Sequence, residues 1–133
     1  MLIQDHDERQ TREYHSDNVS HYLAADATWG RIDILHVFRG PSLGMLRRAE
    51  RLPTGAGLTL PVVTMEDIIG LKVQALVNDP TRAVGDWNDI RLLVDAAQAQ
   101  GAKLDWALLE DYLRLFDLGD KLAELKSIYG PTQ

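Results

Sequence analysis

The chain has 133 residues, which suits one domain with a genuine core, and it contains no cysteine, which excludes disulfides, cysteine zinc sites and thiol nucleophiles. Its formal net charge is −6 at pH 7 without any block of positive charge, which argues against a protein that grips nucleic acid chiefly by neutralising phosphates. The acidic N-terminus lacks the apolar run of a signal peptide and no apolar stretch has membrane-spanning length, so we expect a soluble, cytoplasmic protein that does not contact a membrane.

The first half of the chain, residues 1–63, is expected to consist mainly of strands. Residues 1–17 are highly charged without an apolar period, which is typical of a frayed terminus or an edge strand. Residues 19–24 alternate in polarity and predict a strand. Further on, SLGMLRRAER predicts a short basic helix over 42–51, and LTLPVV predicts a short strand over 58–63, in which Pro61 favours a sheet edge.

RIDILHVF, residues 31–38, is almost wholly apolar and rich in branched side chains, which predicts a strand buried on both faces. Asp33 is the exception in this strand. Side chains alternate along a strand, so Asp33 shares a face with Leu35 and Val37. A carboxylate on that face needs either a partner or a function.

The second half, residues 64–133, is expected to be helical. Thr64-x-x-Asp67 is a capping-box pattern that starts a helix reaching about Val77. Three more helices are predicted, over 84–100, from the cap Asp105 to about 116, and over 120–129. The expected fold class is therefore α+β, with a small mixed sheet packed against a C-terminal helical region in one domain over 1–133.

Lys72 is the unexpected residue of the first of these helices. At 100° per residue it falls in the middle of the apolar arc, whereas the opposite arc holds Glu66, Asp67, Gly70 and Gln74. In the next helix, Asp86 and Asp89 also fall within the apolar arc. Three charged side chains are thus predicted to project from the core faces of consecutive helices.

Two explanations remain open for these charges. The simpler one is a salt bridge between Lys72 and one of the two aspartates. The other is a polar pocket, shared with Asp33, for a phosphate-bearing ligand with a bound metal, because lysine binds phosphate as a point charge and carboxylates hold magnesium.

Other apolar and basic residues are interpreted structurally. We interpret Arg47, Arg48 and Arg51 as a solvated helix face, which a nucleotide or tRNA edge could use, and Tyr112 as a packing residue. One core is predicted to contain Ile34, Ile68, Leu76, Ile90 and Leu93.

The order of these segments resembles the nucleotidyltransferase superfamily, in particular its AbiEii branch of toxins from toxin-antitoxin systems. The resemblance covers about residues 20–115 and is most specific in RIDIL, in PVVTMEDIIGLKVQAL and in R-x-x-x-DWNDIRLLV. It implies a nucleotidyltransferase-like fold. The implied activity is magnesium-dependent transfer of a nucleoside monophosphate from a triphosphate to an acceptor hydroxyl, for example on tRNA or protein.

The resemblance also assigns roles to individual residues. Asp33 matches the later catalytic aspartate, which joins the Mg²⁺ site or acts as base. Lys72 matches the helix lysine that contacts the nucleotide phosphates, and Arg82 matches the basic position before the following helix. Asp89 matches the catalytic acid at the start of that helix, and Asp86 is its neighbour in the nucleotide site.

One family motif has no counterpart at its expected place. Gly-Ser or Gly-Gly followed by Asp-x-Asp should precede RIDIL, but GPSLG follows it, and the pair Asp5 and Asp7 has no glycine-rich segment before it. We therefore expect a chain that resembles the second half of a domain and is inactive alone. The alternative is a degenerate or split member that serves as an interaction or nucleotide-binding module. An exposed sheet edge beside 31–38 would favour a homodimer or a partner chain.

Overall fold

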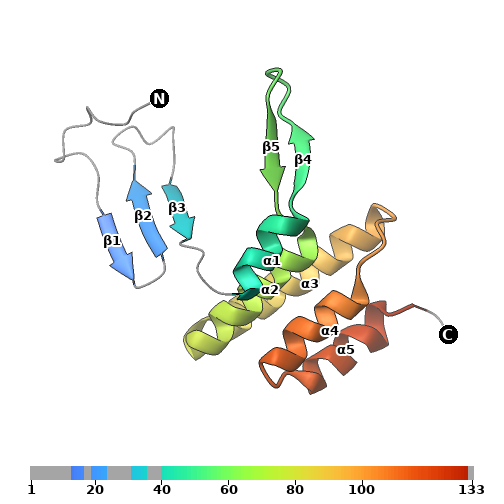
Figure 1. Cartoon of the computed structure of the whole chain (residues 1–133). Helices are drawn as coiled ribbons and strands as arrows, with labels where there is room; N and C mark the ends of the chain where they lie inside the picture. The colour runs from blue at the N-terminus through green and yellow to red at the C-terminus, as the bar shows by residue number, and fades with distance from the viewer. Residues whose placement is uncertain (1–12, 17–18, 24–30, 36–39, 132–133) are drawn as a thin grey trace. The chain divides into compact units, whose positions relative to one another are not determined.

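The computed structural model describes residues 13–16, 19–23, 31–35 and 40–131 (Figure 1). It contains both helices and strands, which confirms the α+β class. The chain divides into two compact units, Met1–Gly44 and Met45–Gln133, which are described separately. Within the described residues, no helix combines the length and the apolar character needed to cross a membrane.

The first unit contains a three-stranded antiparallel sheet in the order β1-β2-β3. Its strands are β1 (Glu13–Ser16), β2 (Val19–Leu23) and β3 (Arg31–Leu35). Of the two alternatives for residues 1–17, the edge strand is present over 13–16, and the predicted strand from residue 19 is confirmed. The end of the predicted 31–38 strand and the pair Asp5 and Asp7 lie outside the described residues.

β3 lies at one edge of this sheet as far as the described strands show. Ile34 on β3 is exposed. The prediction of a strand buried on both faces is therefore wrong at this position. A short apolar run has the same composition in a central strand as in an edge strand, so periodicity alone did not distinguish them.

In the middle of the chain, α1 (Gly40–Arg48) is followed by a hairpin of β4 (Glu50–Pro53) and β5 (Thr59–Val62). The strand predicted over 58–63 is confirmed, but the basic helix predicted over 42–51 ends early, because its last residues pair with β5 instead. Every pair among the described strands is antiparallel and the strands form two sheets, so the expected single mixed sheet is wrong.

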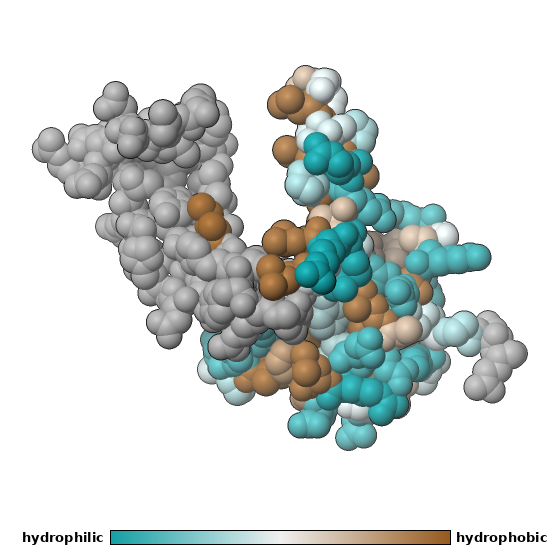
Figure 2. All heavy atoms as spheres, viewed as in Figure 1, coloured by the Kyte–Doolittle hydropathy of each residue, from teal (hydrophilic) through white to brown (hydrophobic). Residues whose placement is uncertain are grey.

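The β4–β5 hairpin carries exposed apolar side chains, namely Leu52, Leu58, Leu60 and Val62. Figure 2 shows brown side chains on the part of the hairpin at the top of the view. Its turn contains Gly55 and Gly57, both at positive φ. The Thr54 N–H donates to the Leu58 carbonyl at 2.9 Å. In an antiparallel ladder, hydrogen-bonded and non-hydrogen-bonded residue pairs alternate. Counted from this hydrogen bond, Pro53 and Pro61 belong to non-hydrogen-bonded pairs, so their backbone nitrogens face away from the partner strand. Each outer edge lacks one donor, which hinders pairing with a further strand.

The helical region comprises α2 (Met65–Asn78), a 3-10 turn η1 (Pro80–Arg82), α3 (Ala83–Ala99), α4 (Trp106–Leu115) and α5 (Gly119–Tyr129). All four predicted helices are confirmed. Two begin at their predicted caps, since the side chain of Thr64 accepts from the Asp67 N–H and that of Asp105 from the Leu108 N–H.

The core of the second unit lies between these helices, where α2 packs against α3 and α4, and α5 packs against the same two helices (Figure 1). Leu76 and Ile90 belong to this core as predicted, and Leu93 packs against it. Ile68 is only partly buried. The buried cluster consists of Ile69, Val73, Leu76, Ile90, Val94, Leu109, Leu113, Leu122 and Leu125.

Candidate functional site

Lys72 on α2 forms the predicted salt bridge to α3. Its Nζ lies 2.7 Å from Asp89 Oδ2 and 3.5 Å from Asp86 Oδ1. The Lys72 side chain is 27% exposed, compared with 44% for Lys121 and 41% for Lys126. The prediction of a shielded Lys72 that faces these aspartates is therefore confirmed.

Asp86, in the first turn of α3, lies between two cations. Its side chain is only 6% exposed, and Arg82 Nε lies 3.2 Å from its Oδ2. Arg82 Nη2 also donates to Asp86 Oδ1 at 3.4 Å. Two cations, Lys72 and Arg82, thus compensate one buried carboxylate, and the preceding η1 turn brings Arg82 to it.

Asp89 does not lie on the core face of α3, because its side chain is 50% exposed. The buried residues of α3 are Asp86, Ile90, Val94 and Ala97, which form a narrow stripe. Asp89 is 300° along the helix from Asp86 and lies beside this stripe. The prediction of a core position is wrong for Asp89, although its ion pair with Lys72 is present.

Lys72, Arg82, Asp86 and Asp89 form a group that we call the α2–α3 ion cluster. It contains two cations and two anions, so its formal charge is zero. Each carboxylate already pairs with a cation. Neither carboxylate is therefore unpaired and ready to bind a metal. The lysine ammonium and the arginine guanidinium are both partly exposed, so each can exchange a carboxylate for a phosphate oxygen.

Asp33 lies on β3 in the first unit, directly opposite His21 of β2. The resemblance implies Mg²⁺ at Asp33. Among the residues whose side chains are described, no group of three His, Cys, Asp or Glu residues is arranged to hold a metal. The side chain of Asp33 lies outside those residues, so the implied Mg²⁺ site stays a prediction.

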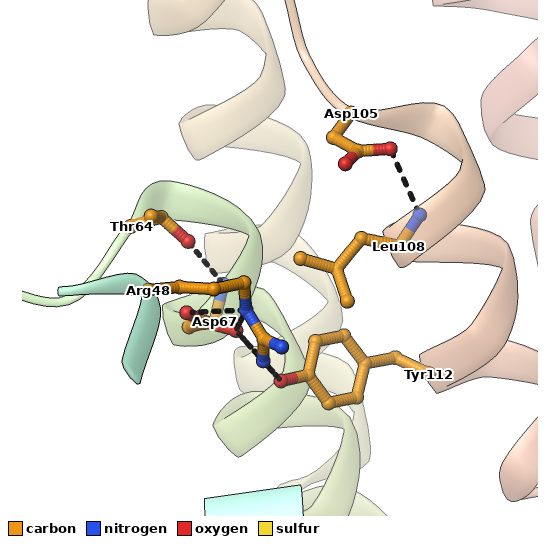
Figure 3. Close-up of polar contacts among 6 residues, drawn as sticks. All are labelled: Arg48, Thr64, Asp67, Asp105, Leu108 and Tyr112. Atoms are coloured by element: carbon orange, nitrogen blue, oxygen red, sulfur yellow. Dashed lines mark hydrogen bonds and ion pairs between the residues drawn. The ribbon is translucent and has the colours of Figure 1, made fainter. Parts of the chain in front are cut away.

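A second polar network was not predicted from the sequence (Figure 3). Asp67, completely buried in the first turn of α2, accepts from Arg48 Nη2 at 2.7 Å and from the Tyr112 hydroxyl at 2.7 Å. Arg48 Nε lies 3.2 Å from both Asp67 oxygens, and its Nη2 donates to the Tyr112 oxygen at 2.9 Å. These contacts tie the ends of α1 and α2 to α4.

Gly70 lets the Tyr112 ring reach this network. A Cβ at Gly70 would lie 2.7 Å from two ring carbons of Tyr112. The helical periodicity placed Asp67 and Gly70 on the polar arc of α2. Both are buried, because α2 packs against both α3 and α4 and its buried surface is broader than one stripe. An interior glycine in a well-capped helix was the available signal, since glycine costs about 1 kcal/mol there without a packing reason.

The network sets the ionisation of its members. Burial alone would raise the pKa of Asp67, but the hydrogen bonds from Arg48, Tyr112 and Thr64, together with the Arg48 charge, hold the pKa of this carboxyl below its ordinary value of 3.8. Burial, followed by the adjacent Asp67 carboxylate, raises the pKa of the Tyr112 phenol well above its ordinary value. At neutral pH the network therefore contains a charged Asp67 and a neutral Tyr112.

Acid is expected to destabilise the second unit through Asp67. Because its pKa is lower in the folded chain than in the unfolded chain, its contribution is complete above pH 3.8 and is lost as the pH falls through the folded value. The free energy of unfolding, measured by urea denaturation between pH 6 and pH 2.5, should fall more steeply for the natural chain than for Asp67→Asn. Equal slopes would show that Asp67 is not linked to folding.

Comparisons with known proteins do not place the chain in a family. No protein-family model, curated protein or solved structure matched it. Its function is therefore inferred from the geometry and from the residue pattern.

Proposed function

We propose that this chain is a nucleotidyltransferase-like protein that binds the phosphates of a nucleoside triphosphate through Lys72 and Arg82 and does not transfer the nucleotide by itself. The observation that supports the proposal is the convergence of two partly exposed cations, from α2 and η1, at Asp86 in the first turn of α3. A cytoplasmic location, which the lack of cysteine favours, would supply such nucleotides.

The two cations suit different parts of a triphosphate. Lys72 provides a point charge and Arg82 a planar fork that matches two phosphate oxygens. Asp86 and Asp89 hold both cations in place while no ligand is bound. Because phosphates must compete with these carboxylates, we expect modest affinity that weakens with added salt.

Transfer would require metals held by closely spaced acids, and only Asp33 matches a metal-binding position of the family. One carboxylate on a strand does not by itself hold Mg²⁺ strongly, so no catalytic step is assigned to the chain alone. The acceptor, whether tRNA or protein, would be selected by residues outside the α2–α3 ion cluster.

Lys72→Met tests the phosphate-binding role. Removing one charge-assisted contact should weaken the binding of a nucleoside triphosphate by about tenfold. The variant should still fold, with a cost of about 1 kcal/mol, because Asp86 keeps Arg82. Isothermal titration calorimetry with ATP, GTP, CTP and UTP measures the affinity.

Lys103→Met is the matched control, since Lys103 is exposed and lies away from the cluster in sequence. It should leave the affinity unchanged. Equal losses in the two variants would mean that the nucleotide binds by general charge attraction. No binding of any nucleotide to the natural chain would contradict the proposal.

A second candidate function is that of an interaction module, as a homodimer or with a partner chain. It is favoured by the apolar side chains exposed on the β4–β5 hairpin. A two-stranded hairpin is marginally stable unless something covers its apolar face. This candidate predicts association without nucleotide binding, so the same titration separates the two functions.

A further inference from the structure

Asp86 differs from the other members of the α2–α3 ion cluster in its burial. Its side chain is only 6% exposed, whereas the side chains of Lys72, Arg82 and Asp89 are all partly exposed. Lys72 Nζ and Arg82 Nη2 lie 3.5 Å and 3.4 Å from Asp86 Oδ1. Asp86 Oδ2 is buried and accepts no hydrogen bond from the described residues, so its compensation is the charge at Arg82 Nε, 3.2 Å away. The negative charge of Asp86 therefore depends on these two cations.

Phosphate binding would remove this compensation. In the proposed function, phosphate oxygens replace carboxylate oxygens at Lys72 and Arg82. Asp89 can then turn to water, because its side chain is half-exposed. Asp86 cannot do so from its buried position, and it would face a new anion as well. A buried carboxylate without a cation is costly, and such a group becomes neutral by binding a proton.

We propose that Asp86 takes up a proton from the solvent when the phosphates of a nucleotide bind Lys72 and Arg82. This inference rests on the proposed function and specifies how the same site is regulated. Because the complex then holds more protons than its free partners, the affinity rises as the pH falls. The neutral carboxyl group can also donate its O–H to a phosphate oxygen, which converts a competitor for the cations into a contact with the ligand.

The charged groups around Asp86 leave it as the place where the proton binds. Within the described residues, they come from three elements: Lys72 from α2, Arg82 from η1 and Asp89 from α3 itself. Lys72 and Arg82 already carry the positive charges that bind the phosphates. Asp89 keeps its contact with water, which stabilises its charge.

Isothermal titration calorimetry of the full chain with ATP tests this proton uptake. At pH 7, titrations in PIPES and in imidazole buffer measure the protons bound per nucleotide, because the two buffers differ in ionisation enthalpy. We expect the natural chain to take up about 0.5 to 1 proton, and its affinity to rise about threefold to tenfold as the pH falls from 8 to 7.

Asp86→Asn keeps the size of the side chain without its charge. It should lose this uptake and bind ATP at least as tightly as the natural chain at pH 8. Protons bound by the nucleotide or by the four histidines of the chain remain in this variant, so the difference from the natural chain reports Asp86. Asp89→Asn is the matched control, because it removes the exposed carboxylate of the same cluster and should retain the uptake.

A measurement on the natural chain guards against variants that fail to fold. On saturation with ATP at pH 7, the carboxyl ¹³C resonance of Asp86 should move towards the position of a carboxylic acid, while that of Asp89 should not. An unmoved Asp86 resonance, or equal proton uptake in the natural chain and Asp86→Asn when both bind ATP, would overturn the inference and leave the proposed function intact. Absence of ATP binding to the natural chain would contradict both.

Discussion

Asp67→Ala is expected to lower the free energy of unfolding by about 3 kcal/mol, because it removes the buried acceptor and leaves Arg48 and the Tyr112 hydroxyl without their partner. The carboxylate is completely buried, and without it Arg48 and the Tyr112 hydroxyl keep only their hydrogen bond to each other. Urea denaturation followed by circular dichroism at pH 7 measures the change.

Two variants separate the loss of the buried network from the cost of an ordinary substitution in the same region. Tyr112→Phe removes only the hydroxyl and should cost about 1 kcal/mol. Asp111→Ala replaces an exposed aspartate on the same helix as Tyr112 and should change stability by no more than about 0.5 kcal/mol. If Asp67→Ala costs no more than Asp111→Ala, the network does not stabilise the fold.

Gly70→Ala is expected to destabilise the chain by about 2 kcal/mol, although alanine is the better helix former. The added Cβ would lie 2.7 Å from the Tyr112 ring, and that ring is buried between α2 and α4. Gly85→Ala is the matched control, because a Cβ at Gly85 of α3 meets nothing within 4 Å. It should stabilise the chain by up to about 1 kcal/mol.

A double-mutant cycle identifies the cause of the Gly70 effect. In a Tyr112→Leu background, the ring is absent and Gly70→Ala should cost much less than it does in the natural chain. The same denaturation measurement applies. An unchanged cost in this background would show that Gly70 is required for a reason other than the approach of Tyr112.

The helices could be predicted from local signals because each signal acts within a few residues. Thr64 and Asp105 cap α2 and α4 through their own following backbone, and glycine or a breaker marks the helix ends. The Lys72 ion pair could be predicted as well, because α2 and α3 are joined by a short connection and must pack side by side.

The Arg48, Asp67 and Tyr112 network could not be predicted in this way. Arg48 and Tyr112 are 64 residues apart, and no local pattern relates them. A helical wheel assigns one buried stripe, whereas α2 contacts two helices and buries Asp67 as well. Similarly, β4 forms because it pairs with β5, although its sequence continues a basic helical pattern.

We propose that the chain recognises a nucleoside triphosphate without transferring it. The most direct test is to incubate the purified chain with α-³²P-labelled nucleotides, a tRNA pool and Mg²⁺, Mn²⁺ or Zn²⁺, and to measure label on tRNA and on the protein itself. We predict no transfer under any of these conditions, even where calorimetry detects binding that depends on Lys72. Transfer by the chain alone that disappears in Asp33→Asn would contradict the proposal.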